Sequence, residues 1–329
     1  MKSAVRKRIP AICLMMAILF LAVSLMPGGC RKKKKKLFFP PPPAPERPEV
    51  GGTVYNAAAS VGDLLSYQIN TGTLEYSYAV MKGEYFGDIG CGSLIPMGGF
   101  GPNVYTTSGN DTVVLLPDKL ALIGTDNGWL IAGVPEVSGS YTFADIGGYY
   151  NYVGYEIDED TGVPEADYGT LHMDRGTYKV WFFDDGATTA NPPDVSGTWF
   201  DKGNGILDFY WGIIKIGYIM IYPSVNGNIL IIDMAVNNGI VLGVKQQPVT
   251  SGNFDGTYDV LDTMGSPLDT VTIAGTSLTG ALGSRTLIYD IPWTGMITDG
   301  ADFTGLLNPE GIFFGVLTGT PSAIAGIME

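Results

Sequence analysis

The chain has 329 residues, of which 45% are hydrophobic and 16% are charged, so it is long enough and apolar enough to bury a sizeable core. Residues 1–50 hold eleven of the nineteen lysines and arginines, whereas residues 51–329 carry eight cations against 31 acidic residues, a net charge of −23. Such an acidic surface repels phosphate backbones, which excludes nucleic-acid binding through phosphate contacts.

Residues 1–29 have the pattern of a secretory signal peptide. A basic start precedes an almost wholly apolar run over residues 9–26, and the small residues Gly28 and Gly29 follow it. Cys30 comes next, and a cysteine at this place resembles the lipobox of bacterial lipoproteins, although Pro27 stands where that family usually has a branched aliphatic residue. In that family the cysteine becomes the lipidated first residue of the mature chain. The resemblance therefore implies that Cys30 is a lipidation site.

An uncleaved signal anchor is the alternative for this leader. The six cationic residues at 31–36 outnumber those before the apolar run, and the positive-inside rule would then keep the following chain in the cytoplasm. The apolar run is short for a membrane span, which usually needs ~20 residues, and this favours the lipoprotein interpretation. Arg31 follows the cysteine in place of an aspartate, so the resemblance to Gram-negative lipoproteins favours sorting to the outer membrane.

Residues 30–50 are predicted to form a basic and proline-rich tether. Lys32 to Lys36 follow Arg31, and six prolines lie between positions 40 and 48. Proline fixes φ and removes a hydrogen-bond donor, so this segment is not expected to form a packed element. Its lysines can lie against anionic lipid headgroups, where each cation adds about 1 kcal/mol. The membrane is thus the expected partner, through both Cys30 and the basic run.

From residue 51 onward the sequence predicts short antiparallel strands. Residues 63–70 and 74–80 alternate between apolar and polar side chains across a short turn, and this period of two is typical of half-buried strands. Residues 83–102 are rich in glycine and are predicted to form an irregular loop. Asn127-Gly128 then predicts a hairpin, because both central residues of a type I′ turn need a positive φ.

One pattern recurs three times: a turn glycine, three or four apolar residues, and a Gly-Val pair. The turn glycines are Gly128, Gly239 and Gly311, and their spacings are too long and uneven for a solenoid or a regular propeller. We therefore predict an all-β fold, an antiparallel sandwich or barrel built from two or three related units. The predicted units are residues 51–145, 146–250 and 251–329, with one continuous β domain over 51–329 as the alternative.

The residues that usually carry catalysis are scarce. His172 is the only histidine, and it alternates with Leu171 and Met173, so we expect it on the polar face of a strand with no second ligand or triad partner. Cys91 is the one cysteine outside the leader and the lipidation site, which excludes an intrachain disulfide in the mature chain. Phosphate-binding loops and nucleophile elbows are absent from the sequence, so a protein without cofactor or enzymatic activity is favoured over an enzyme.

Carboxylates crowd one loop, and they suggest the only metal site that we predict. The spacing of Asp158, Asp160 and Gly162 is similar to the start of a calcium loop, in which alternate carboxylates converge on one cation and glycine allows the bend. The remaining ligand spacing and the closing glutamate are missing. Calcium at Asp158 and Asp160 is therefore one hypothesis for this loop, and a solvated acidic turn is the other.

Aromatic residues gather around Trp181, Trp199 and Trp211. Surface rings beside acids would suit stacking against sugars, so these three tryptophans are candidate ligand-binding residues. Rings of this kind also form the core of many β proteins, which is the alternative interpretation.

Together these patterns favour a non-catalytic β-scaffold or binding module in the cell envelope. The alternative is an envelope protein that binds or cleaves glycans, because only carboxylates remain to run a reaction and glycan cleavage needs two of them. The expected partner is an envelope glycan or protein. A cleft that is lined by aromatic rings and holds two converging carboxylates would favour the glycan hypothesis.

Overall fold

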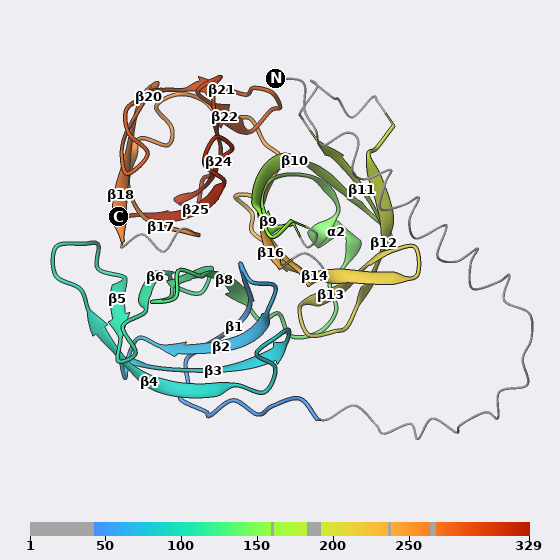
Figure 1. The fold of residues 1–329 in the computed structure, drawn as a ribbon, viewed down its shortest axis with the longest axis vertical. Coiled ribbons are helices and arrows are strands. Elements are labelled where there is room, and N and C mark those ends of the chain that lie inside the picture. Colours follow the sequence, from blue (N-terminus) through green and yellow to red (C-terminus); the bar gives the residue numbers. More distant parts are fainter. Residues whose placement is uncertain (1–42, 159–160, 183–191, 236–237, 264–267) are drawn as a thin grey trace, which may run out of the picture. The chain divides into compact units, whose positions relative to one another are not determined.

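The structure is a computed structural model, and it describes residues 43–329 except 159–160, 183–191, 236–237 and 264–267. The described chain is almost entirely antiparallel β-structure, which confirms the predicted fold class. Figure 1 shows three rings of strands, each in its own colour range along the chain. No helix in the described part of the chain is long and apolar enough to cross a membrane. The leader, Cys30 and the lysine run lie outside the described residues.

Barrel 1 is a closed barrel of eight antiparallel strands in which each strand pairs with its neighbour in sequence and the last pairs with the first. Its strands are β1 (Thr53–Ala59), β2 (Leu64–Asn70), β3 (Glu75–Lys82), β4 (Ile89–Pro96), β5 (Val104–Thr107), β6 (Thr112–Leu116), β7 (Leu120–Gly124) and β8 (Leu130–Pro135). The predicted hairpin at Gly128 joins β7 to β8. Gly128 has a positive φ but Asn127 does not, so the turn is not the type I′ turn that the sequence predicted.

The glycine-rich stretch of barrel 1 is a strand where the sequence predicted an irregular loop. Strand β4 runs through it and pairs with β3. A Cβ atom on Gly90 would lie 2.5 Å from the Tyr78 ring, and one on Gly92 would lie 2.8 Å from the Tyr76 ring. The glycines therefore give two interior tyrosines room against the barrel wall, which explains why this strand lacks the usual alternation.

Barrel 2 is a second closed barrel of eight antiparallel strands, and one helical turn, α2 (Phe143–Ile146), precedes it. Its strands are β9 (Gly148–Ile157), β10 (Pro164–Asp174), β11 (Thr177–Phe182), β12 (Val195–Asp201), β13 (Ile206–Trp211), β14 (Ile214–Tyr222), β15 (Ile229–Met234) and β16 (Gly239–Lys245). The barrel closes where β16 pairs with β9. Tyr150, Tyr178 and Phe209 belong to the cluster that fills its interior.

Barrel 3 is a nine-stranded antiparallel sheet that curls into a ring, with β20 and β21 as its edges (Figure 1). Its strands are β17 (Gly256–Asp262), β18 (Asp269–Ala274), β19 (Ser277–Gly280), β20 (Arg285–Thr286), β21 (Ile288–Tyr289), β22 (Met296–Thr298), β23 (Phe303–Asn308), β24 (Ile312–Leu317) and β25 (Ser322–Met328). Tyr258, Phe303 and Phe313 lie in its own interior cluster.

The outer faces of the three barrels share one hydrophobic core. This central core contains Leu122 from barrel 1, Ile231 from barrel 2 and Phe314 from barrel 3, all fully buried. Neighbouring side chains on a strand point to opposite faces, so Leu230 and Ile232 fill the interior of barrel 2 while Ile231 packs outward into the central core. A strand that is buried on both faces reads as a continuous apolar run, which accounts for the sequence of β15.

Residues 44–50, which the sequence analysis assigned to the tether, lie against the outer face of β2. The Arg47 guanidinium donates to Ser66 Oγ at 2.7 Å and to Gln68 Oε1 at 3.3 Å, and the amide of Val50 donates to Gln68 Oε1 at 3.1 Å. These residues form no helix or strand, but their hydrogen bonds hold them against β2. Proline lacks a donor, but the arginine between the prolines supplies several.

Replacing Arg47 with alanine should release residues 44–50 from barrel 1. The side chain is mostly buried against β2, and its hydrogen bonds to neutral acceptors are worth about 1–2 kcal/mol of unfolding free energy together. Limited proteolysis of this segment should become faster, and urea denaturation should show the modest loss. The exposed neighbour Glu46 provides the control, since Glu46→Ala should change neither measurement. Equal proteolysis of both variants would contradict the docking.

Candidate functional site

The three barrels meet at the carboxylate of Glu310, in the turn between β23 and β24. This carboxylate accepts hydrogen bonds from the ammonium of Lys119 in barrel 1 and from Ser224 Oγ and Asn226 Nδ2 in barrel 2. Its side chain is largely buried. The burial raises the pKa of Glu310, but the lysine and the two polar donors outweigh it and hold the pKa below its usual range. One ionised carboxylate thus links all three barrels.

Amide side chains extend this junction. Asn308 is fully buried, accepts a hydrogen bond from the amide of Glu310 at 2.7 Å and donates to the carbonyl of Gly227 at 3.0 Å. Gln247 donates to the carbonyl of Asn226 at 3.1 Å. The turns that meet here are therefore held by side chains as well as by the central core.

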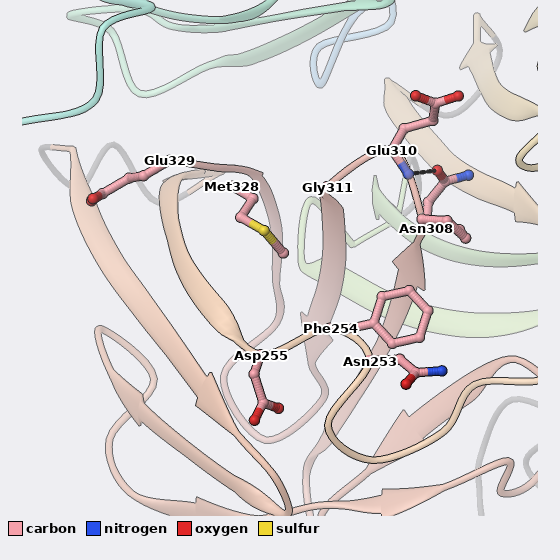
Figure 2. Close-up of a pocket in the computed structure, with 9 residues that line it drawn as sticks. Asn253, Phe254, Asp255, Asn308, Glu310, Gly311, Met328 and Glu329 are labelled. Atoms are coloured by element: carbon pink, nitrogen blue, oxygen red, sulfur yellow. Dashed lines mark hydrogen bonds between the residues drawn. The ribbon is translucent and has the colours of Figure 1, made fainter.

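A pocket of about 570 Å³ opens beside the junction, at one rim of barrel 3. Its lining includes Phe254, Asp255, Glu310, Met328 and Glu329. Figure 2 shows that the carboxylates of Asp255, Glu310 and Glu329 point away from one another. The pocket therefore does not bring two carboxylates together, as glycan cleavage requires.

A second group of acids is buried between barrels 1 and 2. Asp63 precedes β2 and Asp233 lies on β15, and Asp63 Oδ1 and both carboxylate oxygens of Asp233 accept no hydrogen bond from any described residue. Burial and, to a smaller extent, the charge of Asp63 raise the pKa of Asp233, Lys215 opposes them, and the resulting pKa is about 8. Asp233 therefore holds a proton at neutral pH.

A third acid on the outer face of barrel 2 is fully paired. Asp208 on β13 forms ion pairs with Lys202, at 2.7 Å, and with Lys215. Burial raises the pKa of Asp208, but the two lysines outweigh it and keep that pKa below its usual value. This group is an ionised pair network rather than a reactive carboxyl.

The three candidate tryptophans come from neighbouring strands of barrel 2 but do not form one cleft. Trp181 on β11 is only 3% exposed, and its ring lies 6.4 Å from that of Tyr149. Trp199 on β12 packs against the interior cluster of the barrel, and its indole nitrogen donates to the carbonyls of Asp174 and Thr177. Trp181 and Trp199 thus agree with the alternative interpretation, in which these rings are part of the packed core. Trp211 ends β13 and is half-buried.

His172 and Cys91 lie apart from each other, in different barrels. His172 is on β10, on the opposite face from the buried Leu171 and Met173, as predicted, and its ring stacks on Tyr149 with centroids 4.2 Å apart. Partial burial lowers the pKa of His172. Cys91 is an exposed free thiol on β4, not in a loop, so no described histidine is positioned to activate it.

The carboxylate of Asp158 caps the turn between β9 and β10, where its Oδ1 accepts a hydrogen bond from the amide of Thr161 at 2.8 Å. Asp160 lies outside the described residues, so the calcium hypothesis for this loop stays a prediction. Among the described residues, no three histidine, cysteine, aspartate or glutamate side chains are grouped to hold a metal ion.

The junction at Glu310 was not predicted from the sequence. Its partner Lys119 lies 191 positions away, so no local pattern connects the two residues. The same holds for Asp233, which follows an apolar run and resembles an ordinary strand-end acid. An acidic residue inside a strand that is otherwise apolar on both faces is the one local signal for Asp233.

Comparisons with known proteins add little to this geometry. No protein-family model and no curated protein matches the sequence. Among solved structures, the chain is similar to a protein of unknown function from the DUF3598 family of Nostoc punctiforme, with 10% sequence identity and a TM-score of 0.21. The similarity covers 84% of this chain and 94% of that one. These values give no ground for assigning a function.

Proposed function

We propose that this chain is an exported, lipid-anchored protein of the cell envelope whose three-barrel body is a non-catalytic scaffold or binding module. The observation that carries this proposal is the shared core. Three barrels bury their outer faces against one another, and each interior is filled by its own side chains. Such a body offers its rims and outer surface, rather than a lumen, to a partner.

The anchor in this proposal is Cys30, assisted by Lys32 to Lys36. Because residues 44–50 lie on barrel 1, the free tether is shorter than the sequence alone indicates. The fourteen residues from Cys30 to the start of the docked segment, 30–43, reach about 43 Å at ~3.1 Å per residue in an extended proline-rich conformation. A lipid at Cys30 would therefore hold barrel 1 close to a bilayer. Arg31 after the cysteine favours the outer membrane.

Replacing Cys30 with alanine should abolish labelling of the protein by a fatty-acid probe and leave the leader uncleaved. The physical reason is that the thiol is the acceptor of the lipid. Cys91→Ala is the matched control, because Cys91 is the exposed cysteine of the folded body and should not affect labelling. Equal labelling of wild type and Cys30→Ala would refute the lipid anchor and leave the uncleaved signal anchor as the alternative.

A glycan-binding or glycan-cleaving protein of the envelope is the second candidate function. The observation that favours it is the half-exposed Tyr149 ring, which stacks on His172 and offers a face to a sugar. Incubation of the purified protein with peptidoglycan and a panel of polysaccharides separates the two functions. Product release that one Asp or Glu substitution abolishes, with the fold intact, would favour the glycan enzyme over the scaffold.

A further inference from the structure

The turn between β13 and β14 presents apolar side chains to solvent. Ile213 in this turn is 88% exposed and Ile214 is also exposed, and the half-buried Trp211 precedes them. Phe200 on β12 is 58% exposed, and its ring meets that of Tyr210 edge to face at 5.5 Å. We call these five residues, Phe200, Tyr210, Trp211, Ile213 and Ile214, the apolar tip.

The charges beside the apolar tip are unusual for this acidic body. Lys202 and Lys215 are two of only eight cations in residues 51–329. Lys215 follows Ile214 and pairs with Tyr210, whereas Lys202 lies near Phe200 in the turn between β12 and β13, at the other end of β13 from Ile213. They pair with Asp208, whose side chain is almost fully buried, so the more exposed charges of this network are the two ammonium groups. Lys215 also lies 3.7 Å from the centre of the Tyr218 ring.

This composition identifies the kind of surface that the tip fits. Tryptophan and tyrosine are enriched at membrane–water interfaces, and lysines near such interfaces extend their ammonium groups toward the headgroups. Transfer of exposed isoleucine side chains out of water lowers the free energy. The rest of the acidic body is repelled by anionic headgroups, so contact at this tip would orient the protein on a bilayer.

We propose that the apolar tip inserts into the interfacial region of the bilayer to which the chain is anchored. This inference rests on the proposed membrane anchoring, because the short tether supplies the bilayer as the surface near the body. The anchored protein would then make two contacts with the membrane, one through its N-terminal anchor and one through barrel 2.

The structure offers a matched control for this proposal. Val225 is fully exposed in the turn between β14 and β15, so it lies at the opposite end of β14 from the apolar tip. Its neighbours Ser224 and Asn226 contact Glu310 at the junction of the three barrels. An apolar-to-polar change at Val225 therefore also removes an exposed apolar side chain, but away from the proposed contact.

The test uses the full chain, isolated from membranes and reconstituted into vesicles of phosphatidylethanolamine and phosphatidylglycerol with brominated acyl chains. Bromine should quench part of the tryptophan fluorescence, and Trp211→Phe should remove the quenched part. The double change Ile213→Ser and Ile214→Ser should weaken partitioning of the tip roughly tenfold and abolish the quenching. Val225→Ser should leave the quenching unchanged, and circular dichroism should show the same fold in all variants.

Other outcomes separate this inference from the proposed function. Fatty-acid labelling of Cys30 without any quenching at Trp211 would refute insertion of the apolar tip and would support the lipid anchor. A protein that is not labelled would refute the lipid anchor. Quenching at Trp211 would then show whether the apolar tip inserts into the bilayer in a chain that is held by its uncleaved leader. A tip-dependent dimer in detergent-free solution, measured by sedimentation, would assign the tip to a second copy and overturn the membrane contact.

Discussion

Replacing Glu310 with alanine should lower the free energy of unfolding by about 3 kcal/mol, because it removes the carboxylate that accepts hydrogen bonds from Lys119, Ser224 and Asn226. The ammonium of Lys119 is partly exposed and regains water, which keeps the loss below that of a fully buried pair. The unfolding transition in urea should also become broader, since this residue joins all three barrels.

Two further variants make the result specific to the junction. Glu310→Gln keeps an acceptor for the two neutral donors and loses the charge, so its loss should lie between wild type and Glu310→Ala. Glu136 is exposed just after β8, and Glu136→Ala should change the unfolding free energy by less than about 0.5 kcal/mol. A loss in Glu310→Ala no larger than in Glu136→Ala would refute the role of the junction.

The protein should be more stable at pH 5 than at pH 8, and Asp233 should account for most of the difference. The unfolded chain releases this proton near pH 4, whereas burial in the folded state holds it until about pH 8. The folded state therefore binds more protons between these values, and stability falls as the pH rises through them. The full effect on the free energy of unfolding is up to about 6 kcal/mol, and it is complete above the folded pKa.

Asp233→Asn should remove most of this pH dependence, because the amide carries no charge at any of these pH values. Urea denaturation of the wild type and of Asp233→Asn at pH 5, 6, 7 and 8 measures how the free energy of unfolding depends on pH. Mutual repulsion among the surface carboxylates has the same sign, so Asp269→Asn at an exposed position serves as the control and should leave the slope almost unchanged. An unaltered slope in Asp233→Asn would show that Asp233 is ionised throughout this range.

The strands of this protein are well predicted by local patterns. The sequence predicted strands at 63–70 and 74–80, and the structure has β2 at Leu64–Asn70 and β3 at Glu75–Lys82. The recurring turn glycines lie at the starts of β8, β16 and β24 or just before them. Side-chain alternation and glycine turns act within a few residues, so they can be read without knowing the rest of the chain.

Patterns were misleading where a distant contact overrides the local preference. Strand β4 lacks alternation because its glycines make room for tyrosines on β3, and residues 44–50 pack on β2 through Arg47 despite their prolines. In both cases the deciding partner lies on another strand. The local sequence around β4 therefore predicted a loop, and the prolines around Arg47 gave no sign of its contact with β2.

The candidate sites depend even more on tertiary structure. Composition and spacing alone were enough to establish an all-β chain with an acidic body, a basic N-terminal region and few catalytic residue types, since these properties need no contacts. Whether a carboxylate is paired, protonated or open to a ligand depends on what surrounds it in space. Glu310 meets a lysine 191 positions away, Asp233 is buried against another barrel, and Trp181 is buried while Ile213 is exposed. Only the packing of three barrels around one core decided these differences, because burial and electrostatic interaction depend on distance in space and not on separation along the chain.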